Sequence, residues 1–454
     1  MMTRRESDSI GTMDVPEKAY YGVQTLRAKN NFKITGRPLH PEFIKNLARI
    51  KKAAAYTNMA AHVLDEEKGN AIVKACDEII AGKLHNQFIV DAIQGGAGTS
   101  ANMNANEVIA GRGNALAGKR LLHPNDDINM SQSSNDTFPT AMHIAAVLAM
   151  EDKLLPALDT LIETFRVLEA KNEGIVKSGR THLQDATPIK FSQEISGWRS
   201  SLERDRQLLV SALPYLKELA LGGTAVGTGL NAPKGFDSAV AKAVSELTGK
   251  DFVTAPNKFH ALTSKDELVF AHGALKALAA DLMKIANDIR WLASGPRDGL
   301  GEICIPENEP GSSIMPGKVN PTQCEQVTMV AVQVFGNDAA VGFAASQGNF
   351  ELNVFMPVLA YNFLQSVRLL SDSIRSFNDH CAVGITADRE KMRHNLHNSL
   401  MLVTALNPYI GYENAAKTAK TAFAENISLK EACVKLGFLT AERFDQVFHP
   451  EEMV

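Results

Sequence analysis

The chain has 454 residues, of which 45% are hydrophobic and 22% are charged, and its formal net charge is −4. At this length a single hydrophobic core stops growing, so we expect about two to four structural units. No stretch is rich in lysine and arginine, which argues against a nucleic-acid partner, because binding to phosphates needs clustered cations. A few local cations would still be enough for a small anion. No run of residues approaches the ~18 apolar residues of a membrane span.

The N-terminus and the cysteines bear on location. Arg4 and Arg5 form a twin-arginine pair, but no apolar segment follows, so we interpret the pair as solvated charge rather than an export signal. The five cysteines are odd in number, widely spaced and without a CxxC motif, as expected of reduced thiols in the cytoplasm. We expect all five to be buried as small apolar side chains: Cys76, Cys304, Cys324, Cys381 and Cys433.

Seven-residue apolar patterns predict long helices in the middle of the chain. Residues 141–170 carry one such row, formed by Val147, Leu154, Leu161 and Leu168. Pro156 should kink this helix rather than end it, because the periodicity continues past the proline. Residues 190–220 are also helix-like.

The clearest pattern lies between Ser264 and Pro296. Two rows of apolar residues repeat every seven positions and are offset by three, as in a packed helix bundle. Ser264 and Glu267 have the spacing of a capping box, which would begin the helix, and Gly295-Pro296 should end it.

Residues 323–378 are again helix-like, with interruptions expected at Asn337-Asp338 and Pro357. Strand signals are few and short, as in residues 252–254, and no alternation of strands and helices suggests a parallel sheet. We therefore expect a mainly all-α protein with a central up-and-down bundle of long helices. The expected domains are an N-terminal domain (1–138), the central bundle (139–385) and a small helical C-terminal domain (386–454).

Five stretches between the expected helices are dense in glycine, serine, threonine and asparagine, which bring hydrogen-bonding groups through irregular chain. They are residues 94–106, 123–137, 179–186, 222–231 and 311–321.

The sequence offers little for a metal or a cofactor. His394 and His397 lack clustered cysteine or carboxylate partners, so we expect no zinc site. The glycines of 222–229 follow a helix-like stretch rather than a strand, which argues against a dinucleotide fingerprint. We expect no cofactor.

Two residues in these polar stretches could carry chemistry. Lys318 follows two serines and Gly317, and such a loop can cradle an anion with backbone N–H groups and an ammonium. The alternative is a surface hairpin with a solvated lysine. His182 lies in a polar stretch, and from the residues alone it is either functional or a satisfied structural histidine.

The stretch GSSIMPGKVNP (311–321) resembles the signature loop of the aspartase/fumarase superfamily. Four further stretches resemble family segments in the same order: SQSSNDTFPTAMH (131–143), GRTHLQDATP (179–188), GGTAVGTGLN (222–231) and NPTQCE (320–325). The resemblance implies a homotetramer with a core of some twenty long helices and active sites that each combine segments of three subunits. Such sharing would suit polar loops placed at the ends of long helices.

The resemblance also implies the chemistry, an anti elimination that yields fumarate through an aci-carboxylate. Ser312 would be the base, because loop amides and Lys318 could stabilise its alkoxide. Lys318 and Asn320, with Ser313 beside them, would bind one carboxylate. His182 would orient or protonate the leaving-group end, paired with Glu325 through a charge-assisted hydrogen bond. The rest of the substrate would contact Thr99, Ser133, Ser134, Asn135 and Thr181.

Within the superfamily the sequence is most similar to class II fumarases. The segment His123, Pro124, Asn125 and Asp126 matches their second dicarboxylate site, and Ser134 stands where aspartases usually carry threonine. The implied enzyme is a metal-independent fumarate hydratase of the tricarboxylic acid cycle, acting on a small dicarboxylate in the cytoplasm.

The N-terminal third points the other way. Residues 20–28, 33–43 and 91–104 are closer to aspartases, and Ala97 stands where fumarases typically carry serine. An aspartate ammonia-lyase is therefore the main alternative, and a non-catalytic helical scaffold is a remote one. Argininosuccinate and adenylosuccinate lyases rank lower, since they lack NPTQCE and HPNDD.

Overall fold

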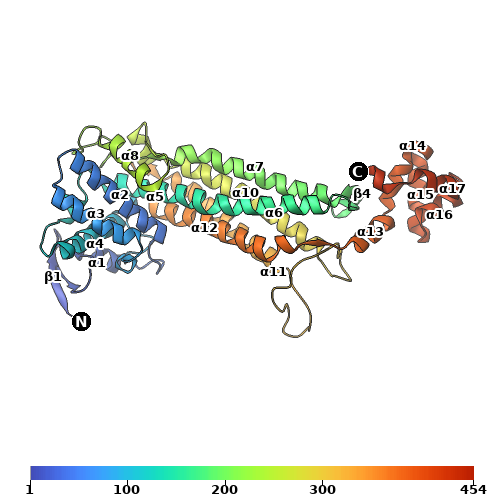
Figure 1. Ribbon diagram of the computed structural model, residues 1–454, viewed down its shortest axis with the longest axis horizontal. Coiled ribbons are helices and arrows are strands. Elements are labelled where there is room, and N and C mark those ends of the chain that lie inside the picture. Colours follow the sequence, from blue (N-terminus) through green and yellow to red (C-terminus); the bar gives the residue numbers. More distant parts are fainter. Residues whose placement is uncertain (1) are drawn as a thin grey trace. The chain divides into compact units, whose positions relative to one another are not determined.

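The computed structural model describes residues 2–454, which are mainly helical (Figure 1). The helices are α1 (Val23–Asn31), α2 (Pro41–Ala60), α3 (Glu66–Ile80), α4 (Thr99–Ala117), α5 (Ser134–Ala149), α6 (Leu155–Lys171), α7 (Phe191–Leu216), α8 (Phe236–Thr248), α9 (Lys258–Thr263), α10 (Asp266–Leu292), α11 (Thr322–Ala345), α12 (Met356–His380), α13 (Arg389–Asn398), α14 (Asn407–Ile410), α15 (Tyr412–Glu425), α16 (Leu429–Lys435) and α17 (Ala441–Val447).

The strands pair two by two into small sheets. They are β1 (Thr3–Ser7) with β2 (Thr12–Pro16), β3 (Val176–Thr181) with β4 (Gln184–Lys190), β5 (Glu218–Leu219) with β6 (Val253–Thr254), β7 (Ile303–Cys304) with β10 (Thr386–Ala387), and β8 (Gly348–Asn349) with β9 (Leu352–Asn353). Only β5 and β6 run parallel in the described chain. The expected mainly all-α class is confirmed.

The chain divides into two compact units. Unit 1 comprises the chain up to Pro156, Arg206–Ala279 and Val332–Ser371. Unit 2 comprises Ala157–Asp205, Ala280–Ala331 and Asp372–Val454. Helices α7, α10, α11 and α12 contribute residues to both units. The three-domain division expected from the sequence stays a prediction.

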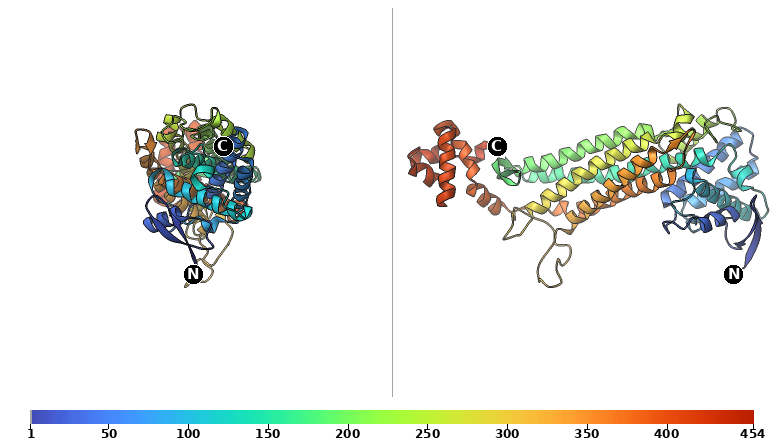
Figure 2. Two further views of the ribbon diagram at one scale, coloured as in Figure 1. Left: turned by 90° about the vertical axis from the view of Figure 1, so that its left-hand side faces the viewer. Right: turned by 180° about the vertical axis from the view of Figure 1, so that it is seen from behind.

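Long helices pack side by side within unit 2, as Figures 1 and 2 show. The rings of Phe165 on α6 and Trp198 on α7 have centroids 5.8 Å apart. The Trp198 Nε1–H donates a 3.0 Å hydrogen bond to Asp288 on α10. Thr164 on α6 donates to Asn378 on α12 at 2.7 Å. Because aromatic burial and interhelical hydrogen bonds join four helices, the bundle expected from the heptad patterns is confirmed.

A buried polar layer joins the helices of unit 1. The ring nitrogens of His272 on α10 lie 3.0 Å from Asp338 on α11 and 2.8 Å from Ser366 on α12. Asn337 also donates to Ser366, at 2.9 Å. The serine and histidine of this Ser-His-Asp alignment are closed to solvent, since His272 and Ser366 are both 0% exposed. It therefore serves packing, where a satisfied polar network fixes which helix faces meet.

The long helix from 266 to 292 ends before Gly295-Pro296, as expected, but its predicted capping box is wrong. Ser264 Oγ donates to Asp266 instead. The carboxylate of Glu267 lies 2.8 Å from Nε2 of His143, and both side chains are buried. A carboxylate with a buried imidazole partner is not available to cap the helix.

Two predicted helix boundaries also need correction. The helix predicted over 141–170 begins at Ser134, and a π-helical turn, Met150–Leu154, interrupts it just before Pro156. Proline has no N–H to donate into the preceding turn, so a widened turn at this point is expected. Helix α11 runs unbroken through Asn337, whose side chain is used between helices. The interruption expected at Asn337-Asp338 is therefore wrong, whereas the one expected near Pro357 is confirmed, since α11 ends at Ala345 and α12 begins at Met356.

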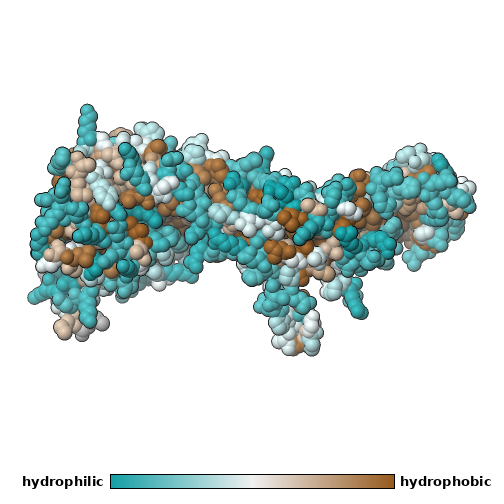
Figure 3. All heavy atoms as spheres, viewed as in Figure 1, coloured by the Kyte–Doolittle hydropathy of each residue, from teal (hydrophilic) through white to brown (hydrophobic). Residues whose placement is uncertain are grey.

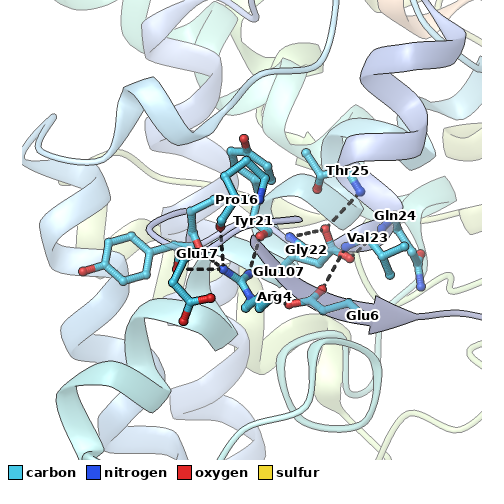
Figure 4. Close-up of polar contacts among 12 residues, drawn as sticks. Arg4, Glu6, Pro16, Glu17, Tyr21, Gly22, Val23, Gln24, Thr25 and Glu107 are labelled. Atoms are coloured by element: carbon cyan, nitrogen blue, oxygen red, sulfur yellow. Dashed lines mark hydrogen bonds and ion pairs between the residues drawn. The ribbon is translucent and has the colours of Figure 1, made fainter. Parts of the chain in front are cut away.

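The interpretation of Arg4 as solvated charge is wrong, as Figure 4 shows. Its guanidinium donates to the backbone carbonyls of Pro16, Ala19 and Tyr21 at 2.9, 2.7 and 2.9 Å. Its Nε donates to the Glu6 carboxylate at 2.7 Å. Arg4 thus fastens the β1–β2 hairpin to the segment that leads into α1.

The cysteines are free thiols, and four of the five are buried as expected. Cys304 is exposed, which corrects the expectation for that residue. It lies in β7 next to the buried Ile303, and successive residues of a strand point to opposite sides.

Candidate active site

In unit 1 the N-termini of two helices meet at Thr99 and Ser134. These residues begin α4 and α5, and their hydroxyl oxygens lie 3.1 Å apart. The N-terminus of a helix presents free N–H groups and the positive end of its dipole. Two such ends at one place suit a carboxylate, so the structure brings together two residues that the sequence predicts to bind substrate.

The loop before Thr99 passes close over the core. Gly98 has a φ of +68°, and a Cβ at this position would lie 1.9 Å from the ring of Phe138. Only glycine therefore allows this path. Ala97 precedes it with a φ of +61° and is buried. The position where fumarases typically carry serine thus lies beneath the loop that delivers Thr99.

Ser133 and Asn135 are held by the first turn of α5. The Ser133 hydroxyl and the Asp136 carboxylate form a capping box. Asp136 also accepts hydrogen bonds from the amides of Gly222 and Thr224, at 3.0 and 2.9 Å. Burial raises the pKa of Asp136 to about 6, against the effect of these hydrogen bonds.

The side-chain amide of Asn135 extends the same connection, since it donates a 2.8 Å hydrogen bond to the backbone carbonyl of Ala225. The glycine-rich loop 222–231 is therefore fixed onto α5 beside the candidate binding residues. Asp136 was missed as a site-forming residue, although its spacing from Ser133 is that of a capping box.

A buried lysine supports the segment that leads into Ser133. Lys51 is 1% exposed, and its Nζ donates to Asn129 and Gln132 at 3.1 and 3.0 Å. Burial lowers the pKa of Lys51 to about 7. Nothing in the sequence distinguishes this lysine from a solvated one on an amphipathic helix, so sequence reasoning missed it.

The residues of the predicted second dicarboxylate site lie together at the start of the π-helical turn Pro124–Ile128. The His123 ring caps this turn and accepts from the amide of Asp126 at 3.3 Å. Asn125 and Asp126 are exposed. Use of this segment as a binding site stays a prediction.

In unit 2, Thr181 and His182 lie at the tip of the β3–β4 hairpin. His182 and Leu183 have φ of +55° and +59° and form its two-residue turn. The hairpin was not predicted, because its turn lacks the glycine or asparagine that usually marks such turns. Both Thr181 and His182 are exposed, and no described residue hydrogen-bonds the His182 ring.

Strand β3 of this hairpin is held by an ionic network around the buried Glu302. The guanidinium of Arg180 binds both oxygens of Glu302, at 3.0 and 2.6 Å. Lys177 lies 3.2 Å from Glu302 and 3.0 Å from Glu194. Since Glu302 is 0% exposed, removal of either cation would leave a buried charge without full compensation. His182 is thus an exposed ring on a rigid support.

The signature loop folds back on itself around Ser312. The Ser312 Oγ accepts hydrogen bonds from the amides of Ile314 and Met315, at 3.3 and 3.0 Å. Two amides aimed at a hydroxyl oxygen favour its deprotonated form. The stabilised alkoxide that a serine base needs thus has local donors.

The same loop brings Lys318 next to Asn320. Lys318 Nζ donates to the side-chain oxygen of Asn320, whose amide donates 2.7 Å to the carbonyl of Gly311. The backbone closes the loop, because the Gly311 amide donates 2.7 Å to the carbonyl of Lys318. Lys318 and Ser313 are exposed, so this pairing leaves an accessible ammonium.

Glu325 lies in the first turn of α11 and is partly buried. No hydrogen bond joins Glu325 to His182 within the described chain, and their pairing stays a prediction. No group of three or more His, Cys, Asp or Glu side chains that could hold a metal occurs among residues 2–454.

Comparison with known proteins fits these motifs. The family described as "Lyase" matches residues 11–336, and the family described as "Fumarase C C-terminus" matches residues 402–454. The class II fumarate hydratase of Bacillus cereus is 59% identical over 458 residues, which cover 100% of this chain and 99% of that protein. That of Campylobacter jejuni is also 59% identical, over 459 residues, with the same coverage of both chains.

A solved structure shows the same fold. The crystal structure of recombinant class II fumarase from Schistosoma mansoni superposes with a TM-score of 0.97 at 42% identity. The match covers 100% of this chain and 99% of that one. The chain belongs to the aspartase/fumarase superfamily of lyases and, within it, to the class II fumarases.

Proposed function

We propose that the chain is a fumarate hydratase, which adds water to fumarate and removes it from L-malate by anti stereochemistry. The observation that carries this proposal is the Ser312 oxygen, which two backbone amides support in the loop that also presents Lys318. The reaction passes through an aci-carboxylate, whose extra charge develops on carboxylate oxygens. A cation and amide donors are the groups that stabilise such charge.

The substrate's two carboxylates have two candidate binding places. Lys318 and Asn320 would hold the carboxylate on which charge develops. The helix N-termini at Thr99 and Ser134 would hold the other, with Asn135 beside them. Each place offers N–H or hydroxyl donors and a positive field, which matches a dianion.

Proton transfer would divide between two residues. Ser312, as alkoxide, would take the proton from the carbon next to the carboxylate. His182 would serve the hydroxyl that leaves as water, with Glu325 as its charged partner. Closure of the 311–320 loop over the substrate would exclude water from the carbanion.

We also propose that the chain works as a homotetramer. Contrary to the expectation from the sequence, helix α11 is long and apolar enough to cross a membrane by length and composition, and 33% of its most apolar stretch is buried. Met329, Val332 and Phe343 are 66%, 61% and 76% exposed and share one face of it. Figure 3 shows apolar patches on the surface of the long helices. A second copy would cover such a face in a soluble cytoplasmic enzyme.

Assembly would also complete the active site. In the proposed tetramer, unit 1 residues around Thr99 and unit 2 residues around Lys318 come from different copies. The exposed His182 ring would find Glu325 across a contact between copies. Catalysis would then require the oligomer.

An absorbance assay tests the reaction. Purified protein should convert L-malate to fumarate without added metal or nucleotide, and L-aspartate should be at least ~100-fold poorer, since a site built for one polar group leaves donors unpaired with another. Ser134, close to the leaving group in this proposal, is the expected source of selectivity. Equal or faster deamination of L-aspartate between pH 7 and 9 would instead indicate an ammonia-lyase, as the aspartase-like N-terminal third allows.

A further inference from the structure

A pocket of about 570 Å³ lies in unit 1, apart from the candidate active-site residues. It is formed by the end of α1, the loop that follows it and the segment 85–91. Its apolar wall consists of Phe32, Pro38, Phe88, Ile89 and Val90, and its basic residues are Lys29, Lys33, Arg37 and His85. None of the residues predicted to bind the dicarboxylate substrate lines it.

The basic side chains of this pocket are not neutralised by acids. No ion pair to Lys29, Lys33 or Arg37 occurs among the described residues. Arg37 Nη1 donates to the neutral hydroxyl of Tyr361 at 3.0 Å. In a chain of net charge −4, three such cations around one pocket form a local positive field.

The one acid in the lining, Asp91, is fully occupied. Its carboxylate accepts from the amides of Thr35, Gly36 and Ile93 at 2.9 Å each. Although burial raises the pKa of Asp91, these hydrogen bonds hold that pKa below its usual value. Its carboxylate thus fixes the loop 34–36 and forms no ion pair with Lys29, Lys33 or Arg37 among the described residues.

A smaller apolar cavity, of about 260 Å³, shares Arg37 and Pro38 with this pocket. Its wall includes Leu39, Phe43 and Phe138. The basic pocket therefore has apolar surface on its own wall and on the far side of Arg37. A ligand with an apolar body and an anionic group matches this combination.

We propose that the pocket at Lys29, Lys33 and Arg37 binds a phosphorylated organic molecule and that its occupancy changes substrate binding. Lysine ammonium groups bind phosphate as compact point charges, and arginine adds a fork of donors. The phenylalanine rings would contact the organic part.

Hydrogen bonds link the pocket to the start of α4. The side-chain amide of Gln94 donates 2.8 Å to the carbonyl of Asp91, in the pocket wall. Its carbonyl oxygen accepts from the Ala101 amide at 2.6 Å. Ala101 lies two residues after Thr99, so a shift of the pocket wall is passed directly to a candidate substrate-binding residue.

A second link runs through α1, as Figure 4 shows. The carboxylate of Glu107 on α4 accepts from the amides of Gly22, Gln24 and Thr25 at 2.8, 3.0 and 3.0 Å. Helix α1 is therefore fixed to α4 at one end and presents Lys29 to the pocket at the other.

Calorimetric titration of the intact oligomer with phenyl phosphate tests the binding. The Lys29→Ala/Lys33→Ala double variant should bind at least ~10-fold more weakly than the unmodified protein, because two charged contacts are lost. The matched control, Lys234→Ala/Lys242→Ala, removes two exposed lysines that line another pocket and should leave affinity unchanged. Saturating fumarate should not displace phenyl phosphate.

Four results would overturn the proposal. Displacement of phenyl phosphate by fumarate would show that it binds in the dicarboxylate site. An equal loss of affinity in both double variants would show that only the net charge of the protein matters. Inorganic phosphate binding as tightly as phenyl phosphate would exclude a role for the apolar wall. Phthalate binding as tightly would exclude a phosphate site. Because binding is measured directly, these results are independent of whether the protein hydrates fumarate.

The coupling is tested separately by kinetics. Phenyl phosphate should change the KM for fumarate by at least ~2-fold in the unmodified protein and leave the KM of Lys29→Ala/Lys33→Ala unchanged, as reciprocal coupling between two sites requires. Binding with an unchanged KM would contradict the link through Gln94.

Discussion

The candidate active-site residues of the two units are supported in different ways. In unit 1, Thr99 and Ser133–Asn135 rest on buried polar groups, among them Asp136 and Lys51. In unit 2, His182 and Lys318 are exposed, one on a hairpin tip and the other in a loop closed by short-range contacts. The first set is preorganised by the fold of one chain, and the second presents its chemistry outward.

This difference fits a division of work. Binding of a carboxylate gains from groups that are fixed before the substrate arrives, because they lose little freedom on binding. Proton transfer and closure over the substrate need groups that can approach it. We infer that unit 1 binds one carboxylate on a preorganised surface and that unit 2 supplies the proton-transfer groups together with the cation for the other carboxylate.

The largest expected effect is that of Lys318→Ala. Loss of the ammonium should raise the barrier by ~3 kcal/mol or more, which is a loss of about 100-fold or more in kcat. The protein should stay folded, since Lys318 is exposed. Steady-state kinetics together with the thermal midpoint measure both, and Lys234→Ala is the matched control. Near-normal rates in a folded Lys318→Ala protein would exclude the proposed mechanism.

Next in size is the coupling of His182 and Glu325. If the two form one hydrogen-bonded unit, His182→Asn and Glu325→Gln should each be severe and the double variant little worse than either. The measured quantity is kcat/KM for all four proteins. A double variant that loses the product of the two single losses would show that the residues act independently.

The fold and the candidate site could be predicted from the sequence only in part. The long helices followed from heptads such as those of 264–296, and the signature loop marked Ser312, Lys318 and Asn320 directly. Lys51 gave no signal, because burial depends on what packs against a helix. Arg180 and Glu302 are 122 residues apart in sequence, and no local pattern reports such a contact.

A third prediction concerns a buried acid in each unit whose pKa is raised. In unit 1, amide donors oppose the effect of burial on Asp136, and its pKa is about 6. In unit 2, burial and the neighbouring Asp281 together raise the pKa of Asp205 to about 7. Because the pKa of Asp205 lies above its unfolded value, the contribution of this residue to stability is greatest below pH ~4 and is lost as pH rises through 7. Asp205→Asn should remove this loss, by up to about 4 kcal/mol at pH 8.

Thermal midpoints of the unmodified protein and Asp205→Asn between pH 5 and 8 measure this effect. The difference should grow with pH. Ser211→Ala, an exposed change on the same helix, is a suitable control. A constant difference across the range would mean that Asp205 does not titrate there.

The smallest expected effect is that of metal removal. Incubation with EDTA followed by desalting should leave kcat for malate unchanged, because serine, histidine and lysine supply the proposed chemistry. The measurement is the initial rate before and after treatment. Loss of activity that an added divalent ion restores would show that a metal takes part in the reaction.

The central claim, that unit 1 and unit 2 residues of different copies form one active site, is tested most directly by mixing two inactive variants. Asn135→Ala changes only the unit 1 set, and Lys318→Ala changes only the unit 2 set. If different copies supply the two sets, about a quarter of the sites in randomly mixed oligomers combine two intact sets. Co-expression should therefore restore activity to about a quarter of the unmodified level. If each chain formed its own site, every site would keep one defect, and activity no higher than that of the separate variants would contradict the claim.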